Sequence, residues 1–204
     1  MKLTFLILLS LITLFGCNKA KDKASESVTN TIIEKTFEQA GVATENIKRA
    51  NKNSADIAIE YDGENLFADD VFTTIVNVTE RMIVFSFNSK DEKITISFSG
   101  LKDMLDSKPI IGKYMPGKAD PKDANGTVVA ITMAKDNGFA YTLAEGEATI
   151  LKINQDEVII DFSGKAATFL DANSPENWKP IQGKIVSKYP AANFIKVKKE
   201  NLFY

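Results

Sequence analysis

Apolar residues follow two different periods along the chain. Over residues 27–41 they recur near the helical period, and a glycine closes the segment, so one short helix is predicted there. From residue 54 onward the period changes to two, as where Ile94, Ile96 and Phe98 alternate with polar residues. This pattern, divided by turns containing Asn, Asp and Gly, predicts a mainly β domain over residues 54–198.

Two stretches of this β region match each other, at about residues 82–114 and 147–187. Each contains a strand ending in Phe-Ser-Gly, then a loop, then the pattern Lys-Pro-Ile-x-Gly-Lys. The match predicts a strand–turn–strand–loop–strand unit that is used twice. Each unit has one apolar face, and two such faces would bury each other in an antiparallel β-sandwich of two sheets. A lipocalin-like barrel is the alternative, because a similar number of strands would form it.

The repeat also predicts details of the core. Gly112 and Gly183 occupy equivalent positions in the middle of a strand, where glycine often marks a bulge or close packing under an aromatic ring. Side chains of the two units are expected to meet across the core without help from a disulfide. Those residues are Ile94, Ile96 and Phe98 in the first unit and Val158, Ile160 and Phe162 in the second.

The start of the chain differs from both of these regions. An apolar run from Leu3 to Phe15 follows Lys2 and ends in Gly16-Cys17, and a lysine-rich polar segment comes directly after it. The run is shorter than the roughly 20 apolar residues that a membrane-spanning helix needs. Cys17 is the only cysteine of the 204 residues, which excludes an intrachain disulfide.

These residues resemble a bacterial lipoprotein signal peptide with its lipobox. The resemblance implies cleavage between Gly16 and Cys17, a diacylglycerol on the Cys17 thiol and, usually, an acylated amino group. Residues 1–16 are then the signal peptide and residues 17–26 a flexible tether. Two or more acyl chains anchor a protein stably, and Asn18 after the cysteine favours the outer membrane of the cell envelope. The whole chain resembles small bacterial lipoproteins that carry a β-sandwich-like domain of unassigned function.

The composition removes much of the usual catalytic chemistry. The sequence has no histidine, so catalytic triads, Cys–His pairs and histidine metal ligands are excluded. A formal net charge of −2 without a basic block argues against nucleic acid as a partner. We therefore expect a non-enzymatic lipoprotein without a cofactor, held at the membrane by its lipid. Its role is binding or structural, with a protein or glycan partner left open.

A few residues remain as candidates for other chemistry. Asp120, Asp123 and Asn125 could give oxygen ligands to Ca²⁺, but EF-hand spacing fails and turn chemistry explains them equally well. Trp178, in a loop between two prolines, is the strongest candidate for an exposed contact. Two further functions stay open. A carrier of a small apolar ligand needs an interior cavity. A carboxylate-based glycosidase needs two acids about 5–10 Å apart beside an exposed aromatic residue.

Overall fold

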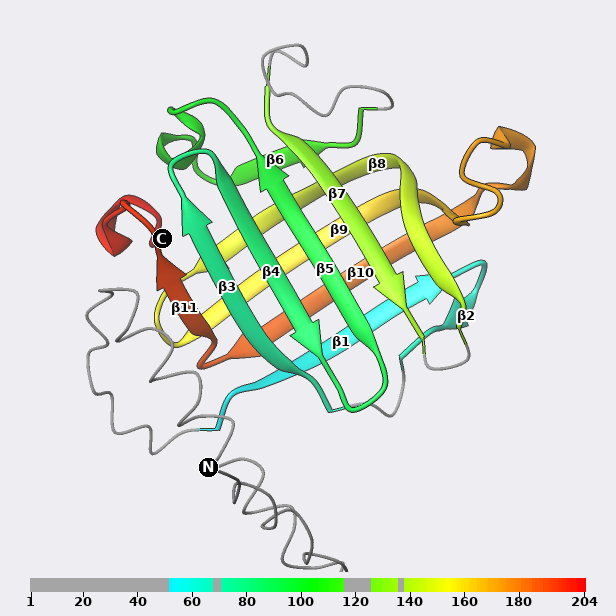
Figure 1. Ribbon diagram of the computed structural model, residues 1–204, viewed down its shortest axis with the longest axis horizontal. Helices are drawn as coiled ribbons and strands as arrows, with labels where there is room; N and C mark the ends of the chain where they lie inside the picture. The colour runs from blue at the N-terminus through cyan, green and yellow to red at the C-terminus, as the bar shows by residue number, and fades with distance from the viewer. Residues whose placement is uncertain (1–51, 68–70, 116–125, 136–137) are drawn as a thin grey trace, which may run out of the picture. The chain divides into compact units, whose positions relative to one another are not determined.

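The computed structural model describes residues 52–67, 71–115, 126–135 and 138–204, which belong to a compact unit spanning Ala50–Tyr204 (Figure 1). The predicted signal peptide, tether and helix, with Gly16 and Cys17, lie outside these residues, as do Asp120, Asp123 and Asn125. The described part is mainly β, as predicted, and its only helical elements are three 3₁₀ turns. None of its helices is long and apolar enough to span a membrane.

The elements follow each other in chain order with short connections. The strands are β1 (Ser54–Tyr61), β2 (Glu64–Asn65), β3 (Thr73–Thr79), β4 (Met82–Asn88), β5 (Lys93–Ser99), β6 (Ile110–Lys113), β7 (Val128–Ala134), β8 (Ala140–Ile153), β9 (Glu157–Thr168), β10 (Lys179–Lys188) and β11 (Ala191–Phe194). The 3₁₀ turns are η1 (Met104–Asp106), η2 (Pro175–Asn177) and η3 (Lys199–Asn201).

All of these strands belong to one curled sheet with the order β11-β3-β4-β5-β7-β6-β8-β9-β10-β1-β2. Two separate antiparallel sheets were predicted, so the observed architecture differs. The sheet is also mixed, because β11 runs parallel to β3. It curls so that β3, β4, β5 and β7 form one layer that crosses over β8, β9, β10 and β1 (Figure 1). Strand β8 joins the layers, since it pairs first with β7 and then with β6 and β9.

The sheet bends where two glycines face each other on β8 and β9. Gly146 pairs with Gly164, and their φ values are 137° and 155°, in the region that side chains rarely adopt. A Cβ atom on Gly164 would lie 1.9 Å from the backbone oxygen of Glu145. The predicted strand end at Gly164 is therefore wrong. Because glycine permits the close approach, β9 bends and continues to Thr168.

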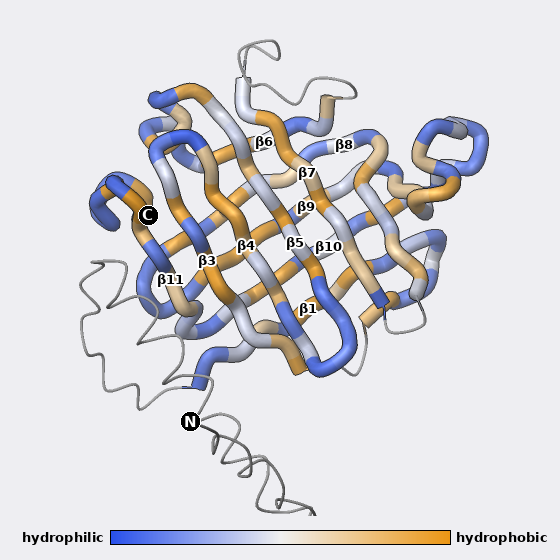
Figure 2. Tube along the Cα trace, viewed as in Figure 1, coloured by the Kyte–Doolittle hydropathy of each residue, from blue (hydrophilic) through white to orange (hydrophobic). Residues whose placement is uncertain are grey.

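The inward faces of the two layers form one hydrophobic core. In β3, β4 and β5 every second residue is buried, and the same alternation is visible as orange bands in Figure 2. All six residues predicted to meet across the core belong to this core, with exposed fractions of 0–5%, so their predicted burial is confirmed. Phe72, Phe85, Phe87 and Phe98 are among the largest fully buried side chains. Aromatic rings therefore fill much of the space between the layers.

Both predicted glycine contacts are present in this core. A Cβ atom on Gly183 would lie 2.3 Å from the ring of Phe162, and one on Gly112 would lie 2.9 Å from the ring of Phe98. Each glycine thus leaves room for the phenylalanine of its own unit. The prediction of close packing under an aromatic ring is confirmed at both positions.

Polar side chains join the two layers at one corner. Asn53 accepts a hydrogen bond from the Thr74 N–H at 2.9 Å and donates one to the Thr74 carbonyl at 2.8 Å, as a neighbouring strand would do. The Ser187 hydroxyl donates to the Thr74 hydroxyl at 2.7 Å, and both residues are fully buried. These bonds leave the buried polar groups of Thr74 paired where β3 meets the other layer.

The C-terminus closes another part of the core. Leu202 is fully buried, and Tyr204 exchanges two backbone hydrogen bonds with Ile153, at 3.1 and 2.8 Å. The Tyr204 hydroxyl accepts from the Ile110 N–H at 3.0 Å and donates to the Ile150 carbonyl. Burial raises the pKa of this hydroxyl above its usual value. The last residue therefore links β6 of the first repeat unit to β8 of the second.

Candidate binding groove on the outer face

A groove of about 620 Å³ lies on the outer face of the layer formed by β1, β8, β9 and β10, with the β1–β2 hairpin at one side. Strand alternation explains its lining. The residues of these strands that face the core are apolar, so the intervening residues face solvent. The hollow is open and lies outside the core, so it differs from the interior cavity that a carrier would require.

Two rows of side chains cross the groove from strand to strand. In the first row, Glu60, Gln182, Ser163 and Glu147 follow each other on β1, β10, β9 and β8. In the second row, Ala58, Lys184, Asp161 and Thr149 occupy the same four strands. We call these the upper and lower rows. Every member of both rows lines the groove.

The register sets the separation of the charged groups. Glu60 and Glu147 stand at the two ends of the upper row, three strand spacings or about 14 Å apart between Cα atoms. Asp161 is diagonal to Glu147 on the neighbouring strand, which corresponds to roughly 7–8 Å. The groove therefore has a carboxylate on each wall and a third one between them.

The charges of the groove are poorly balanced. Its lining contains three carboxylates, Glu60, Glu147 and Asp161, and one cation, Lys184. The Gln182 amide donates to Glu60 Oε2 at 3.0 Å. The Oδ1 atom of Asp161 is closed to solvent and accepts no hydrogen bond from the described part of the chain. Because Oδ1 is closed to solvent, it adds to the negative charge of this face but offers no direct contact to a ligand in the groove.

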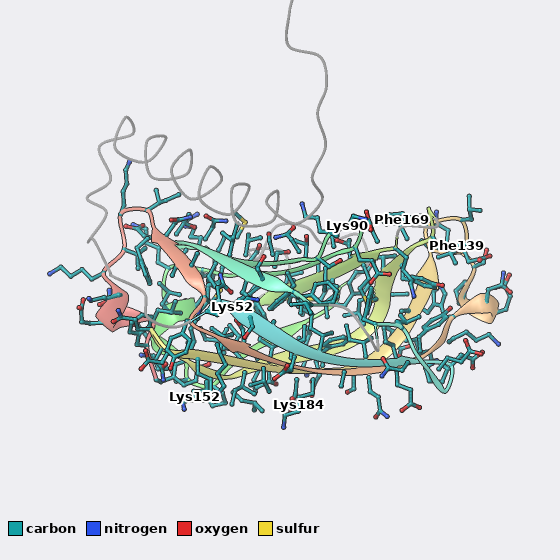
Figure 3. All side chains as sticks on the ribbon, turned by 90° about the horizontal axis from the view of Figure 1, so that it is seen from below. Lys52, Lys90, Phe139, Lys152, Phe169 and Lys184 are labelled. Carbon is teal, nitrogen blue, oxygen red and sulfur yellow. The ribbon has the colours of Figure 1, made fainter. Side chains whose placement is uncertain are left out.

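Lysines lie next to two of the carboxylates without pairing with them. Lys184 is directly opposite Asp161 on β10, and Lys113 is directly opposite Glu147 on β6. Neither lysine forms an ion pair with a residue that the structure describes. Figure 3 shows Lys184 on the outer face, pointing away from the sheet. The two lysines therefore balance part of the charge of these carboxylates from the neighbouring strands, without forming ion pairs with them.

At the start of β9, outside the groove, a carboxylate is paired with two lysines. Glu157 accepts a hydrogen bond from Lys152 at 2.6 Å and another from Lys188. These two bonds lower the pKa of the Glu157 carboxyl to about 2. Glu157 is therefore held between two lysines and is a paired group, unlike the carboxylates of the groove.

Trp178 lies at one end of the molecule, away from both rows. It is partly exposed, and its indole N–H donates to the backbone carbonyl of Asp171 at 3.2 Å, within its own loop. Apolar groups on the same loop are more open, with exposed fractions of 58% for Phe169 and 96% for Leu170. Thr168 and Asn177 donate to the Asp171 carboxylate, both at 2.8 Å, and lower its pKa. The tryptophan is thus fixed against its loop by this network.

A metal site and a cavity for an apolar ligand were the other kinds of site considered, and the calcium candidates lie outside the described residues. Across these residues, no three or more Asp, Glu, His or Cys side chains are arranged to hold a metal ion. A second hollow, beneath Val76, Phe194 and Leu202, measures about 10 Å³, which is too small for an apolar ligand.

The residues of the groove were not recognised as a site from the sequence. Glu60 and Gln182 are separated by 122 positions yet are hydrogen-bonded. The alternating pattern did indicate that Glu60 would face away from the core. Only the strand order shows which polar residues share a face with it. No protein-family model, curated protein or solved structure matches the chain.

Proposed function

We propose that this chain is a lipid-anchored lipoprotein of the cell envelope, in the outer membrane, whose β domain binds a partner and has no catalytic activity. The observation that carries the anchor is Cys17, the only cysteine, placed directly after an apolar run and before a lysine-rich segment. Lipid on Cys17 would hold the protein at the membrane, while the tether separates it from the domain.

A binding role is supported by where the polar groups gather. The upper and lower rows place carboxylates, an amide, hydroxyls and an ammonium group in one open groove, where they can contact a polar ligand. The core is filled by buried phenylalanine rings, which speaks against the alternative of a barrel that carries a small apolar ligand.

A carboxylate-based glycosidase is the less favoured alternative. Glu147 and Asp161 are diagonal neighbours on adjacent strands, so their carboxyl groups can come within the separation of paired catalytic acids. The groove lacks an exposed aromatic side chain among its described lining, because Phe162 is 5% exposed and Trp178 lies elsewhere. Hydrolysis of a glycan that disappears in Glu147→Gln would contradict the non-enzymatic proposal.

The lipid anchor is tested by labelling cells with an alkyne analogue of palmitate. The wild-type chain should take up the label and partition into the detergent phase. Cys17→Ser should lose the label and accumulate with its signal peptide attached, because no thiol remains to be modified. Lys19→Ser, a change in the same segment, should behave as the wild type. Equal labelling of Cys17→Ser and wild type would contradict the proposal.

A further inference from the structure

We infer that the β domain itself docks on the lipid bilayer, with Phe139, Phe169 and Leu170 inserted at the boundary between the headgroups and the acyl chains. We call these three side chains the apolar tip. The inference goes beyond the lipid anchor proposed above, and it rests on that proposal for the choice of membrane. The occupant of the apolar tip is a lipid surface, and the experiment below separates this occupant from a protein.

The apolar tip exposes large hydrophobic side chains from two segments of the chain. Phe139 comes directly before β8, whereas Phe169 and Leu170 directly follow β9. Their exposed fractions are 55%, 58% and 96%. The Phe169 N–H donates to the Ala140 carbonyl at 3.2 Å, so the pairing of β8 with β9 brings the two segments together. A group of exposed apolar side chains of this kind typically marks an interaction site.

Hydrogen bonds hold the turn that exposes the tip. The Asp171 N–H donates to the Thr168 carbonyl at 3.0 Å, which closes the turn containing Phe169 and Leu170. The Asp171 carbonyl accepts from the Trp178 indole at 3.2 Å, and this bond ties the turn to the rest of its loop. The exposure of these apolar side chains is therefore a property of a defined, hydrogen-bonded turn.

A sheet face with almost no charge adjoins the apolar tip. Strands β3, β4, β5 and β7 contain one charged residue, Lys93, whereas β1, β8, β9 and β10 contain two or three each. The outward-facing Ala134 of β7 pairs with Ala140, whose carbonyl accepts from Phe169, so this face leads to the tip. This side of the domain can approach lipid without burying charged groups, whose desolvation is unfavourable.

The shape and chemistry of the tip suit a lipid surface. Neither of the two hollows described above includes a residue of the tip. Figure 3 shows Phe139 and Phe169 on the side of the molecule opposite to Lys184. Phenylalanine and leucine are typical of segments that enter the interface to a depth of about 5–10 Å. Trp178 on the same loop is partly exposed, and tryptophan is enriched at membrane–water interfaces.

The proposed anchor explains why so small a tip suffices. Residues 18–51 separate Cys17 from Lys52, the first described residue. A flexible segment of this length spans about 30 Å, which is comparable to the diameter of a small domain. Because lipid on Cys17 would keep the domain close to the bilayer, insertion of the tip becomes an intramolecular event with a high effective concentration. The tip then has to orient the domain, and not to recruit it.

The test uses the full lipidated chain in vesicles of phosphatidylethanolamine and phosphatidylglycerol, with an environment-sensitive nitrobenzoxadiazole dye on an introduced cysteine. Leu170→Cys places the dye on the tip, and Lys184→Cys places it on the opposite side (Figure 3). Because Cys17 is the only cysteine and its thiol would carry lipid, only the introduced thiol should react. The dye at position 170 should emit several-fold more brightly than in water and be quenched by lipids with a doxyl group near the headgroup. The dye at position 184 should emit as in water.

Matched variants locate the contact. Phe139→Ser combined with Phe169→Ser should reduce the emission rise of the dye at position 170 several-fold, because two apolar side chains no longer enter the lipid. Leu151→Ser is the control, since Leu151 is 44% exposed but lies near the other end of β8. Its emission should equal that of the parent. Unchanged thermal unfolding would show that the variants keep the fold.

Equal emission from the dyes at positions 170 and 184 would overturn the inference, as would an unchanged emission rise in the double serine variant. Water-like emission at position 170 would also overturn it and would leave the tip for a protein partner. Uptake of dye by the chain without an introduced cysteine would show a free Cys17 thiol. Failure of the proposed anchor can therefore be told apart from failure of the tip.

Discussion

Each repeat unit places a glycine against a phenylalanine ring, but the strands that carry these two residues are arranged differently in the two units. In the second unit, Gly183 on β10 is the direct cross-strand partner of Phe162 on β9. In the first unit, β5 and β6 are not adjacent, because β7 lies between them in the sheet. There Gly112 meets both the ring of Phe98 and the side chain of Val129, each at 2.9 Å from a hypothetical Cβ. The two units thus make the same kind of contact, once between adjacent strands and once across an intervening strand.

This difference shows what a repeated segment can specify. The pattern requires a phenylalanine to lie against a glycine, and either a neighbouring strand or a strand one further away can satisfy that requirement. In the first unit β7 lies between β5 and β6, and both β6 and β7 pair with β8, so the two units belong to one continuous sheet. The contact itself is conserved in both units because each ring needs space that only a glycine leaves.

The largest expected loss of stability comes from substituting the glycines that end the two Phe-Ser-Gly patterns. Gly164→Ala should destabilise the domain by about 4 kcal/mol or more, because the new methyl group would meet a backbone oxygen at 1.9 Å and φ is unfavourable. Gly100→Ala should cost roughly 1–3 kcal/mol, since its closest contacts, at 2.6–2.8 Å, are side-chain atoms of Met104. Urea unfolding measures both, and equal losses would show that the bend at Gly164 is not specific to the second unit.

The next largest loss of stability is expected at the two glycine–phenylalanine contacts, which should respond differently to a second substitution. Gly183→Ala should cost roughly 1–3 kcal/mol by overpacking against Phe162. Adding Phe162→Leu should remove part of that loss, so the two changes should be non-additive in a double-mutant cycle. Gly112→Ala combined with Phe98→Leu should recover less, because the Cβ of Val129 still lies in the way. Full additivity in the Gly183–Phe162 cycle would argue against the contact.

A smaller effect concerns the link between the units at the C-terminus. Tyr204→Phe removes the hydroxyl that accepts from the Ile110 N–H and donates to the Ile150 carbonyl, so a loss of about 1–3 kcal/mol is expected. Tyr189→Phe is the control, because the Tyr189 hydroxyl forms no hydrogen bond with the described residues. Thermal unfolding should distinguish the two variants. Equal midpoints would mean that Tyr204 does not join β6 to β8 in solution.

The smallest effect is the pH dependence of the turn that opens β9 in the second unit. The pKa of Glu157 is lowered from 4.5 to about 2 by hydrogen bonds from Lys152 and Lys188. A lowered pKa in the folded state means that the stabilisation is complete above about pH 4.5 and is lost as the pH falls towards 2. Glu157→Gln should therefore lower the stability slightly at pH 7, and its difference from the wild type should disappear near pH 2. A difference independent of pH would contradict this role.

Much of the local structure was predictable, because the alternation of apolar and polar residues along a strand depends only on residues that are close in sequence. The face that each strand buries, the six core residues at 0–5% exposure and the glycines under Phe98 and Phe162 all followed from the pattern. The position of Trp178 in a loop also followed, although its hydrogen bond to Asp171 did not. Such features need no knowledge of which strand lies beside which.

The strand order was not predictable in this way, because it depends on contacts between distant residues. Alternation alone does not distinguish two sheets from one curled sheet, and it read Gly164 as the end of a strand where β9 bends and continues. The groove has the same origin. Glu60 and Gln182 share a row only because β1 pairs with β10 across 122 positions. The sequence by itself determined which side chains leave the core, whereas the tertiary structure decided which of them meet, since pairing of remote strands brings their outward faces together.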